Sequence, residues 1–188
     1  MYVEHIIWPP TSGIKLIGSG EEDCVIDGDS TGRVLQIHDY DLDGDNYKDG
    51  FFDSSTVISG LTIQNGVAES NAGISLYYSD PTISNVVVQN NNAEQFGAGI
   101  GLSYSNPKLD NITIQGNRIE GYGMGDRNGA GIYCKHSSNP IITNSLITEN
   151  IMIDGSGAGL VCRDSSNAIL TNVIISNNSA NDYGGGVI

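Results

Sequence analysis

Aspartates at alternating positions make residues 41–49 the strongest candidate for a metal site in this 188-residue chain. Asp41, Asp43, Asp45 and Asp49 fall at positions 1, 3, 5 and 9 of a tight loop, with the backbone carbonyl of Tyr47 at position 7. Calcium binds about six to eight oxygen atoms, and alternating carboxylates around a sharp turn supply them. We therefore expect these five residues to hold Ca²⁺. Its role would be structural, because the ion would stabilise only the folded loop.

The acidic loop belongs to an aspartate-rich insertion at residues 38–54, and its spacing resembles the Asp-x-Asp-x-Asp-Gly-x-x-Asp calcium loops of integrin-type propellers. Asn46 stands where glycine is usual, but asparagine also adopts the positive φ needed there. A second register starts at Asp39 and puts Gly44 at position 6, as in an EF-hand loop. Gly50 then occupies the place of the closing acid, so the first register is preferred. A solvated acidic loop without metal is the alternative.

A second group of residues has the chemistry to bind an acidic sugar chain. Strand alternation, the corners that follow and the longest loop, at 118–128, place aromatic, basic and acidic side chains on one outward face. The members of this predicted ligand-binding face are Tyr77, Tyr78, Tyr104, Tyr133, Lys135, Arg163, Glu120, Tyr122 and Asp126. Lys135 and Arg163 would lie on adjacent strands, where a neighbouring acid or a bound carboxylate must offset their like charges.

Catalysis on this face is a separate hypothesis. The catalytic candidates are Lys135, Arg163, His136 and Asp164. A deprotonated lysine or arginine could remove the proton beside a uronate carboxyl with help from calcium. Asp126, Asp154 and Asp164 could instead act as paired carboxylates in glycoside hydrolysis, where their separation decides the chemistry. The remaining alternative is a set of solvated surface charges with no catalytic role.

A sequence repeat must position these residues. The segment GAGIGLSYSNPKLDNITIQGN at residues 97–117 recurs in related form from Ala72, Gly129 and Gly157. Corner prolines 81, 107 and 140 are separated by 26 and 33 residues. A period between about 20 and 50 residues indicates a solenoid, propeller or array. The corners are too short to reverse a strand, so we expect a solenoid rather than a propeller.

Each repeat is expected to contain three short strands with alternating apolar and polar residues, at 99–103, 108–110 and 112–115 in the segment above. Stacking predicts two inward columns: Ile74, Ile100, Ile132 and Leu160, and beside them Leu76, Leu102, Cys134 and Cys162. Length varies in one loop per repeat, at 66–71, 91–96, 118–128, 151–156 and 179–184. Solenoid insertions of this kind often gather on a binding face.

Gly60 and four asparagines recur at one corner of the repeat. These residue types tolerate the left-handed backbone, and the asparagine amides can hydrogen-bond to the next repeat, so we predict a ladder of Asn85, Asn111, Asn144 and Asn172. With this ladder and the GAGI strands, the chain resembles the right-handed parallel β-helix proteins of the pectate-lyase-like superfamily. Its GAGI and ITEN pairs are similar to motifs of bacterial polymorphic outer-membrane adhesins.

The resemblance implies an all-β, right-handed parallel β-helix with three strands per turn and about six turns. It also implies export, and a ligand cleft on the strand face described above. The catalytic signatures of polygalacturonases are absent from the sequence, as is the aspartate cluster that pectate lyases use for catalytic calcium.

The composition of the chain argues against some classes of binding partner. The formal charge is −14, with eight Lys plus Arg, so nucleic acid and anionic membranes are poor partners. No run of 18 apolar residues is present, so we expect no membrane span. The three cysteines define no disulfide framework. Cys134 and Cys162 should be neighbours that remain reduced, because parallel neighbours point the same way and give poor disulfide geometry.

We therefore expect residues 1–188 to form a single β-helix domain, a fragment of a longer chain or one that associates end to end through open terminal strands. The leading hypothesis is a calcium-stabilised extracellular or cell-surface module that presents a groove for carbohydrate or protein. The alternative is a lyase or hydrolase acting on acidic polysaccharide.

Overall fold

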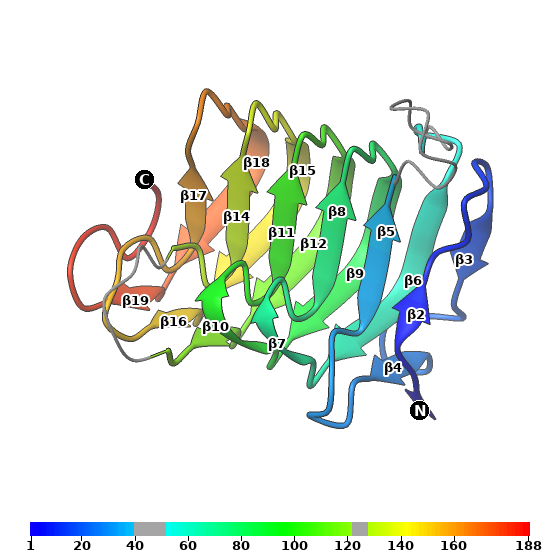
Figure 1. Cartoon of the computed structure of the whole chain (residues 1–188), viewed down its shortest axis with the longest axis horizontal. Helices are drawn as coiled ribbons and strands as arrows, with labels where there is room; N and C mark the ends of the chain where they lie inside the picture. Colours follow the sequence, from blue (N-terminus) through cyan, green and yellow to red (C-terminus); the bar gives the residue numbers. More distant parts are fainter. Residues whose placement is uncertain (40–51, 122–127) are drawn as a thin grey trace, which may run out of the picture.

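The computed structural model describes residues 1–39, 52–121 and 128–188. In these ranges the regular elements are strands, and the pairings between them are parallel. Figure 1 shows the strands side by side along one axis, with the two termini at opposite ends. The chain is thus a β-solenoid of about six turns, each of which we call a rung. None of the described ranges contains a helix long and apolar enough to cross a membrane.

Three sheets run along the solenoid, and each rung contributes a strand to each sheet in its middle part. The eight-stranded sheet contains, in order, β1 (Tyr2–Val3), β4 (Val25–Asp27), β6 (Val57–Gln64), β9 (Thr82–Gln89), β12 (Lys108–Gln115), β15 (Ile141–Thr148) and β18 (Ile169–Ser176), with β3 (Lys15–Ile17) also paired to β6. The five-stranded sheet contains β7 (Val67–Ser70), β10 (Asn92–Phe96), β13 (Arg118–Ile119), β16 (Ile151–Met152) and β19 (Ser179–Ala180). The six-stranded sheet contains β2 (Ile6–Ile7), β5 (Leu35–His38), β8 (Ile74–Tyr77), β11 (Ile100–Ser103), β14 (Ile132–Lys135) and β17 (Leu160–Cys162).

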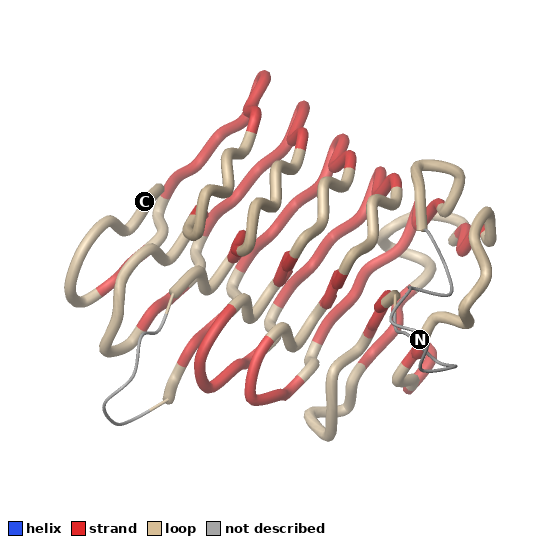
Figure 2. The backbone as a smooth tube through the Cα atoms, turned by 45° about the horizontal axis from the view of Figure 1, so that its top comes forward, coloured by secondary structure: helices blue, strands red, loops and turns tan. Residues whose placement is uncertain are grey.

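The structure corrects the predicted strand boundaries. The segments 108–110 and 112–115 are one continuous strand, β12, which has Asn111 in its middle at φ 50°. One left-handed residue bends such a strand without ending its pairing, and β9, β15 and β18 have an asparagine at the same place. Each of the five predicted variable loops also contains a strand at or near its start. These strands form the five-stranded sheet, as Figure 2 shows at the base of the coils.

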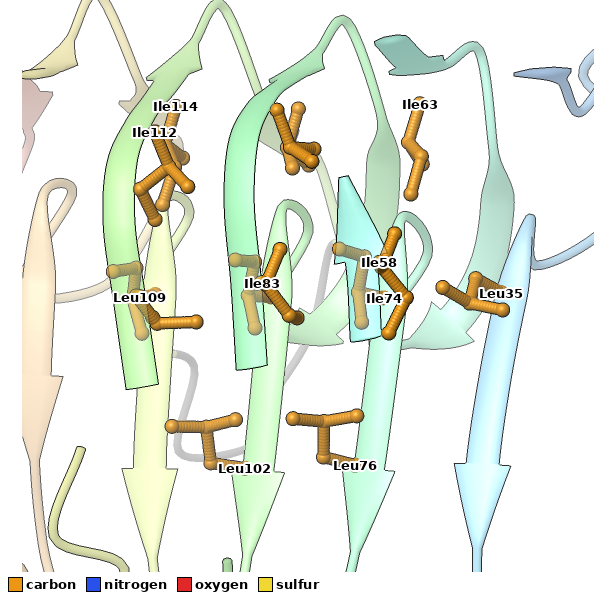
Figure 3. Close-up of a cluster of buried hydrophobic side chains, with 14 of the residues drawn as sticks. Leu35, Ile58, Ile63, Ile74, Leu76, Ile83, Leu102, Leu109, Ile112 and Ile114 are labelled. Carbon is orange, nitrogen blue, oxygen red and sulfur yellow. The ribbon is translucent and has the colours of Figure 1, made fainter. Parts of the chain in front are cut away.

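The core is a column of aliphatic side chains enclosed by the sheets. Ile74, Ile100 and Ile132 are in register and fully buried, and Leu76 and Leu102 form the predicted second column beside them. In Figure 3 the side chains of Ile74, Leu76 and Leu102 and those of the eight-stranded sheet, such as Ile83 and Leu109, fill the same interior. Because each rung adds about the same side chains, burial stabilises the solenoid rung by rung.

The predicted corner ladder is present and lies at the surface. Asn111 donates its amide to Asn85 Oδ1 at 2.8 Å, and Asn172 donates to Asn144 Oδ1 at 2.9 Å. Asn144 itself donates to Asp110 Oδ1 at 2.8 Å, so the asparagine-to-asparagine ladder is interrupted there. Asp110 also accepts from Thr143, and these hydrogen bonds lower the pKa of its carboxyl.

A second asparagine ladder, which the sequence analysis missed, lies inside the solenoid. It consists of Asn91, Asn117, Asn150 and Asn178, whose amides bond in series at 2.9, 3.0 and 2.9 Å. Asn91, Asn117 and Asn150 are fully buried, and each also donates to a backbone carbonyl of the preceding rung. The ladder thereby satisfies backbone groups at the bend where each rung leaves the eight-stranded sheet.

Candidate ligand-binding site

Four side chains project from one corner of successive rungs. Tyr78, Tyr104, His136 and Asp164 follow β8, β11, β14 and β17, and each has a positive φ, between 49° and 54°. Left-handed geometry is unfavourable for such residues by about 1–2 kcal/mol each. Its repetition on four rungs means that the corner backbone is fixed by its surroundings. We call these four residues the corner stack.

A buried serine ladder holds the corner in place. The backbone amides of Ser79, Ser105 and Ser138 donate to the hydroxyl oxygens of the next serine along the solenoid, at 3.1, 3.1 and 3.0 Å; Ser166 is the last acceptor. All four serines are buried. The sequence signal was available, because each serine precedes an Asp or Asn in the motifs YSDP, YSNP, SSNP and SSNA.

The rings of the corner stack lie face to face. Tyr78 and Tyr104 are 4.3 Å apart between centroids and 5° from parallel, and Tyr104 and His136 are 4.8 Å apart and 16° from parallel. Tyr77 meets the edge of this stack, 4.6 Å from Tyr78 in a T-shaped arrangement. Since the stack uses the faces of Tyr104 on both sides, it presents to solvent the ring edges and the phenolic hydroxyl of this 40% exposed residue.

The polar end of the corner stack joins three rungs. The Oγ of Ser103 lies 2.9 Å from Nδ1 of His136, and Nε2 of the same ring lies 3.7 Å from Oδ2 of Asp164. The His136 and Asp164 side chains are 38% and 57% exposed. The structure therefore brings together two of the four catalytic candidates, His136 and Asp164, and adds Ser103.

The prediction that Tyr133 lies on the outward ligand-binding face is wrong. Tyr133 is 6% exposed, because Phe96 stacks on it at 5.0 Å between centroids and 16° from parallel. Phe96 belongs to β10. Gly101, the register partner of Tyr133 in β11, has no side chain and so leaves room for the Phe96 ring. A Cβ at Gly101 would lie 1.8 Å from Asn71 Oδ1, so the Asn71 side chain, from the segment between β7 and β8, covers this part of the face. Ser75 and Val161, which occupy the same register position as Gly101 and Tyr133 in β8 and β17, are buried as well.

The accessible face is consequently the end of the six-stranded sheet and its corner. Lys135 is half-buried there, with Nζ 5.7 Å from the Phe96 ring centroid. Arg163 continues the ladder beyond β17, and its amide donates to Cys134 O at 2.9 Å. The backbone positions thus confirm the prediction that Lys135 and Arg163 lie on adjacent rungs.

The remaining predicted residues lie elsewhere. Glu120 follows β13 in the five-stranded sheet, where it pairs with Arg118. Tyr122 and Asp126 lie outside the described residues, as do all five predicted calcium ligands, Asp41, Asp43, Asp45, Tyr47 and Asp49. In the part of the chain that the structure describes, no group of three or more His, Cys, Asp or Glu residues could hold a metal ion.

Two thiols lie directly behind the accessible face. Cys134 and Cys162 are register partners in β14 and β17, and both are free. A hydrogen bond from Cys134, stronger than the opposing effect of burial, lowers the pKa of the half-buried Cys162 to about 7. The same hydrogen bond and burial raise the pKa of Cys134. Cys162 is therefore the thiol of the pair that ionises first.

The coiled parallel sheets, the aliphatic column and the internal ladders define a right-handed parallel β-helix. The model of the family described as "Right handed beta helix region" matches residues 50–187, most of the chain, and the protein belongs to this family. No curated protein and no solved structure matches the chain significantly.

Proposed function

We propose that this protein is a β-helix repeat module that binds a carbohydrate chain along the corner stack. The observation that supports this proposal is the row of Tyr78, Tyr104, His136 and Asp164 on successive rungs, each of them at least partly accessible to solvent. Successive parallel strands are about 4.8 Å apart, so polar groups recur at that interval along the row. A polymer with regularly spaced hydroxyl groups matches a row of regularly spaced donors and acceptors.

The geometry favours hydrogen bonding over ring stacking as the mode of recognition. The tyrosine faces are used within the stack, so a sugar would meet hydroxyl groups and ring edges. Lys135 and Arg163 beside the corner suit a sugar that has a carboxylate, because charge-assisted hydrogen bonds are about twice as strong as neutral ones. A protein ligand is the alternative. Failure of every polysaccharide to bind would favour it.

A lyase or glycoside hydrolase acting on acidic polysaccharide remains the alternative class. For a lyase, Lys135 or Arg163 would have to act as a base. The Phe96 ring attracts the positive charge of Lys135, which suits this residue to holding a carboxylate rather than removing a proton. We therefore favour the binding module.

Two further properties belong to the same proposal. A Ca²⁺ ion bound by the loop from Asp41 to Asp49 would stabilise the fold, on the basis of the carboxylate spacing. An extracellular or cell-surface location is proposed from the resemblance to exported β-helices.

The binding proposal is tested with a panel of neutral and acidic polysaccharides, followed by titration of the best ligand. Tyr104→Phe removes one hydroxyl and keeps the ring stack, so we expect an affinity about three- to tenfold lower, equivalent to one hydrogen bond. Tyr183→Phe is the matched control, because Tyr183 is 76% exposed and lies outside the corner stack. Equal affinities of both variants for the ligand would reject the corner stack as the binding site.

A further inference from the structure

Ser103, His136 and Asp164 lie on three successive rungs in the order of a nucleophile, a base and a carboxylate. The Ser103 hydroxyl is within hydrogen-bond distance of the His136 ring at 2.9 Å, and the Asp164 carboxylate lies 3.7 Å from the other ring nitrogen. Activated serine nucleophiles are recognised by such roles and geometry, whatever the order in the sequence. The order along this chain follows simply from the coiling of the solenoid.

The neighbours of His136 favour the tautomer that this chemistry requires. With the proton on Nε2, the ring points its N–H toward Asp164, and Nδ1 accepts a hydrogen bond from Ser103. Tyr104 stacks on the ring at 4.8 Å and fixes its plane. Ser103, Asp164 and Tyr104 therefore orient the His136 ring, which remains partly exposed to solvent.

The chain also contains a second serine–histidine pair that lacks these properties. Ser75 Oγ lies 2.8 Å from His38 Nε2, but Ser75 is 1% exposed and no substrate can reach it. Burial, followed by a nearby guanidinium, lowers the pKa of His38 to about 4. This pair is a structural hydrogen bond and provides an internal comparison for the pair at the surface.

We propose that Ser103 is the nucleophile of a hydrolytic site for carboxylic esters. Ser103 Oγ attacks the ester carbonyl carbon while His136 Nδ1 takes the hydroxyl proton. The bond from carbon to the alcohol oxygen then breaks, and His136 returns the proton to the departing alcohol. Water, deprotonated by His136, next attacks the acyl carbon; the bond from that carbon to Ser103 Oγ breaks, and His136 returns the proton to Oγ, which releases the carboxylic acid and regenerates the free serine.

Asp164 acts as a positioning residue in this scheme. Its carboxylate orients the ring and stabilises the imidazolium that forms in each step. Lys135 is the register partner of Ser103 in β14, so it leaves the neighbouring strand on the same face as Ser103 and is the nearest strand residue that could offset negative charge on the carbonyl oxygen. The proposal goes beyond carbohydrate binding and does not depend on which ligand the corner stack takes.

The experiment uses the intact protein with two probes, a fluorophosphonate that labels activated serines and p-nitrophenyl acetate as the ester. We expect one label per chain, located at Ser103 by peptide mapping, and its loss in Ser103→Ala. His136→Phe keeps a ring against Tyr104 but removes the base, so labelling should slow by at least about 100-fold. Ser75→Ala is the matched control and should label at the wild-type rate.

Asp164→Asn tests the positioning role without disturbing the fold, because the Asp164 side chain is exposed and its replacement removes no buried contact. We expect a lower kcat for the ester with an unchanged KM, and recovery in Asp164→Glu. Absence of a label at Ser103 in the folded wild-type protein, or labelling of His136→Phe at the wild-type rate, would overturn the proposal. Should His136→Phe fail to fold, Asp164→Asn decides, and wild-type kcat in that variant would also overturn it.

Discussion

Replacing Asn117 by alanine should destabilise the protein more than the same replacement of an exposed asparagine in the corner ladder. Its Oδ1 accepts from the backbone amide and the side-chain amide of Asn91, and its Nδ2 donates to Val88 O and Asn150 Oδ1. All four hydrogen bonds are 2.9–3.1 Å long, and the residue is fully buried. At about 1 kcal/mol for each hydrogen bond, the variant should lose about 4 kcal/mol of unfolding free energy.

Asn111→Ala is the matched control. Its side chain makes one exposed hydrogen bond, to Asn85, and alanine must adopt the left-handed backbone at φ 50°. We expect a loss of about 2–3 kcal/mol in total, from one hydrogen bond and the left-handed backbone. Equilibrium urea unfolding, followed by far-ultraviolet circular dichroism, measures both variants. A difference of less than about 1 kcal/mol between them would show that the buried ladder contributes little, contrary to the reasoning.

Three further predictions concern pH, packing and metal. Because burial lowers the pKa of His38 from 6.5 to about 4, the unfolded state binds a proton between these values that the folded state does not; stability is therefore full above pH 6.5 and falls toward pH 4. Urea midpoints of His38→Gln should show a weaker loss, and an unchanged loss would contradict this origin. Gly101→Ala should lower stability by about 1–3 kcal/mol through its clash with Asn71, and Asn71→Ala should relieve most of that loss in a double-mutant cycle. Added calcium should raise Tm after EDTA treatment, and Asp43→Ala combined with Asp45→Ala should abolish that rise; equal rises in both proteins would exclude the loop as the site.

The features that could be predicted from the sequence are those that repeat. Ile74, Ile100 and Ile132 each end a recurring Ala-Gly-Ile motif, so their stacking in one buried column followed from the repeat. The buried asparagine ladder could have been found in the same way, because Asn91, Asn117, Asn150 and Asn178 are 26, 33 and 28 residues apart, the spacings of the corners.

Features that depend on non-repeating segments could not be predicted. The strands of the five-stranded sheet recur in register with the repeat, but their first paired residues share no residue type, so no common apolar pattern marked them: Val67, Asn92, Arg118, Ile151 and Ser179. Burial of Tyr133 depends on Phe96, which reaches it from the preceding rung. The contact of Ser103 with His136 similarly requires two residues separated by 33 positions to meet at a corner.

The most direct test of the account is a nuclear magnetic resonance titration that follows the aromatic rings while a polysaccharide ligand is added. The protein offers its own controls, since Tyr2 and Tyr183 are 63% and 76% exposed and lie outside the corner stack. We predict that ring signals of Tyr104 and His136 shift and saturate with ligand, while those of Tyr2 and Tyr183 do not. Saturable shifts confined to Tyr2 or Tyr183 would contradict the assignment of the corner stack as the ligand-binding site.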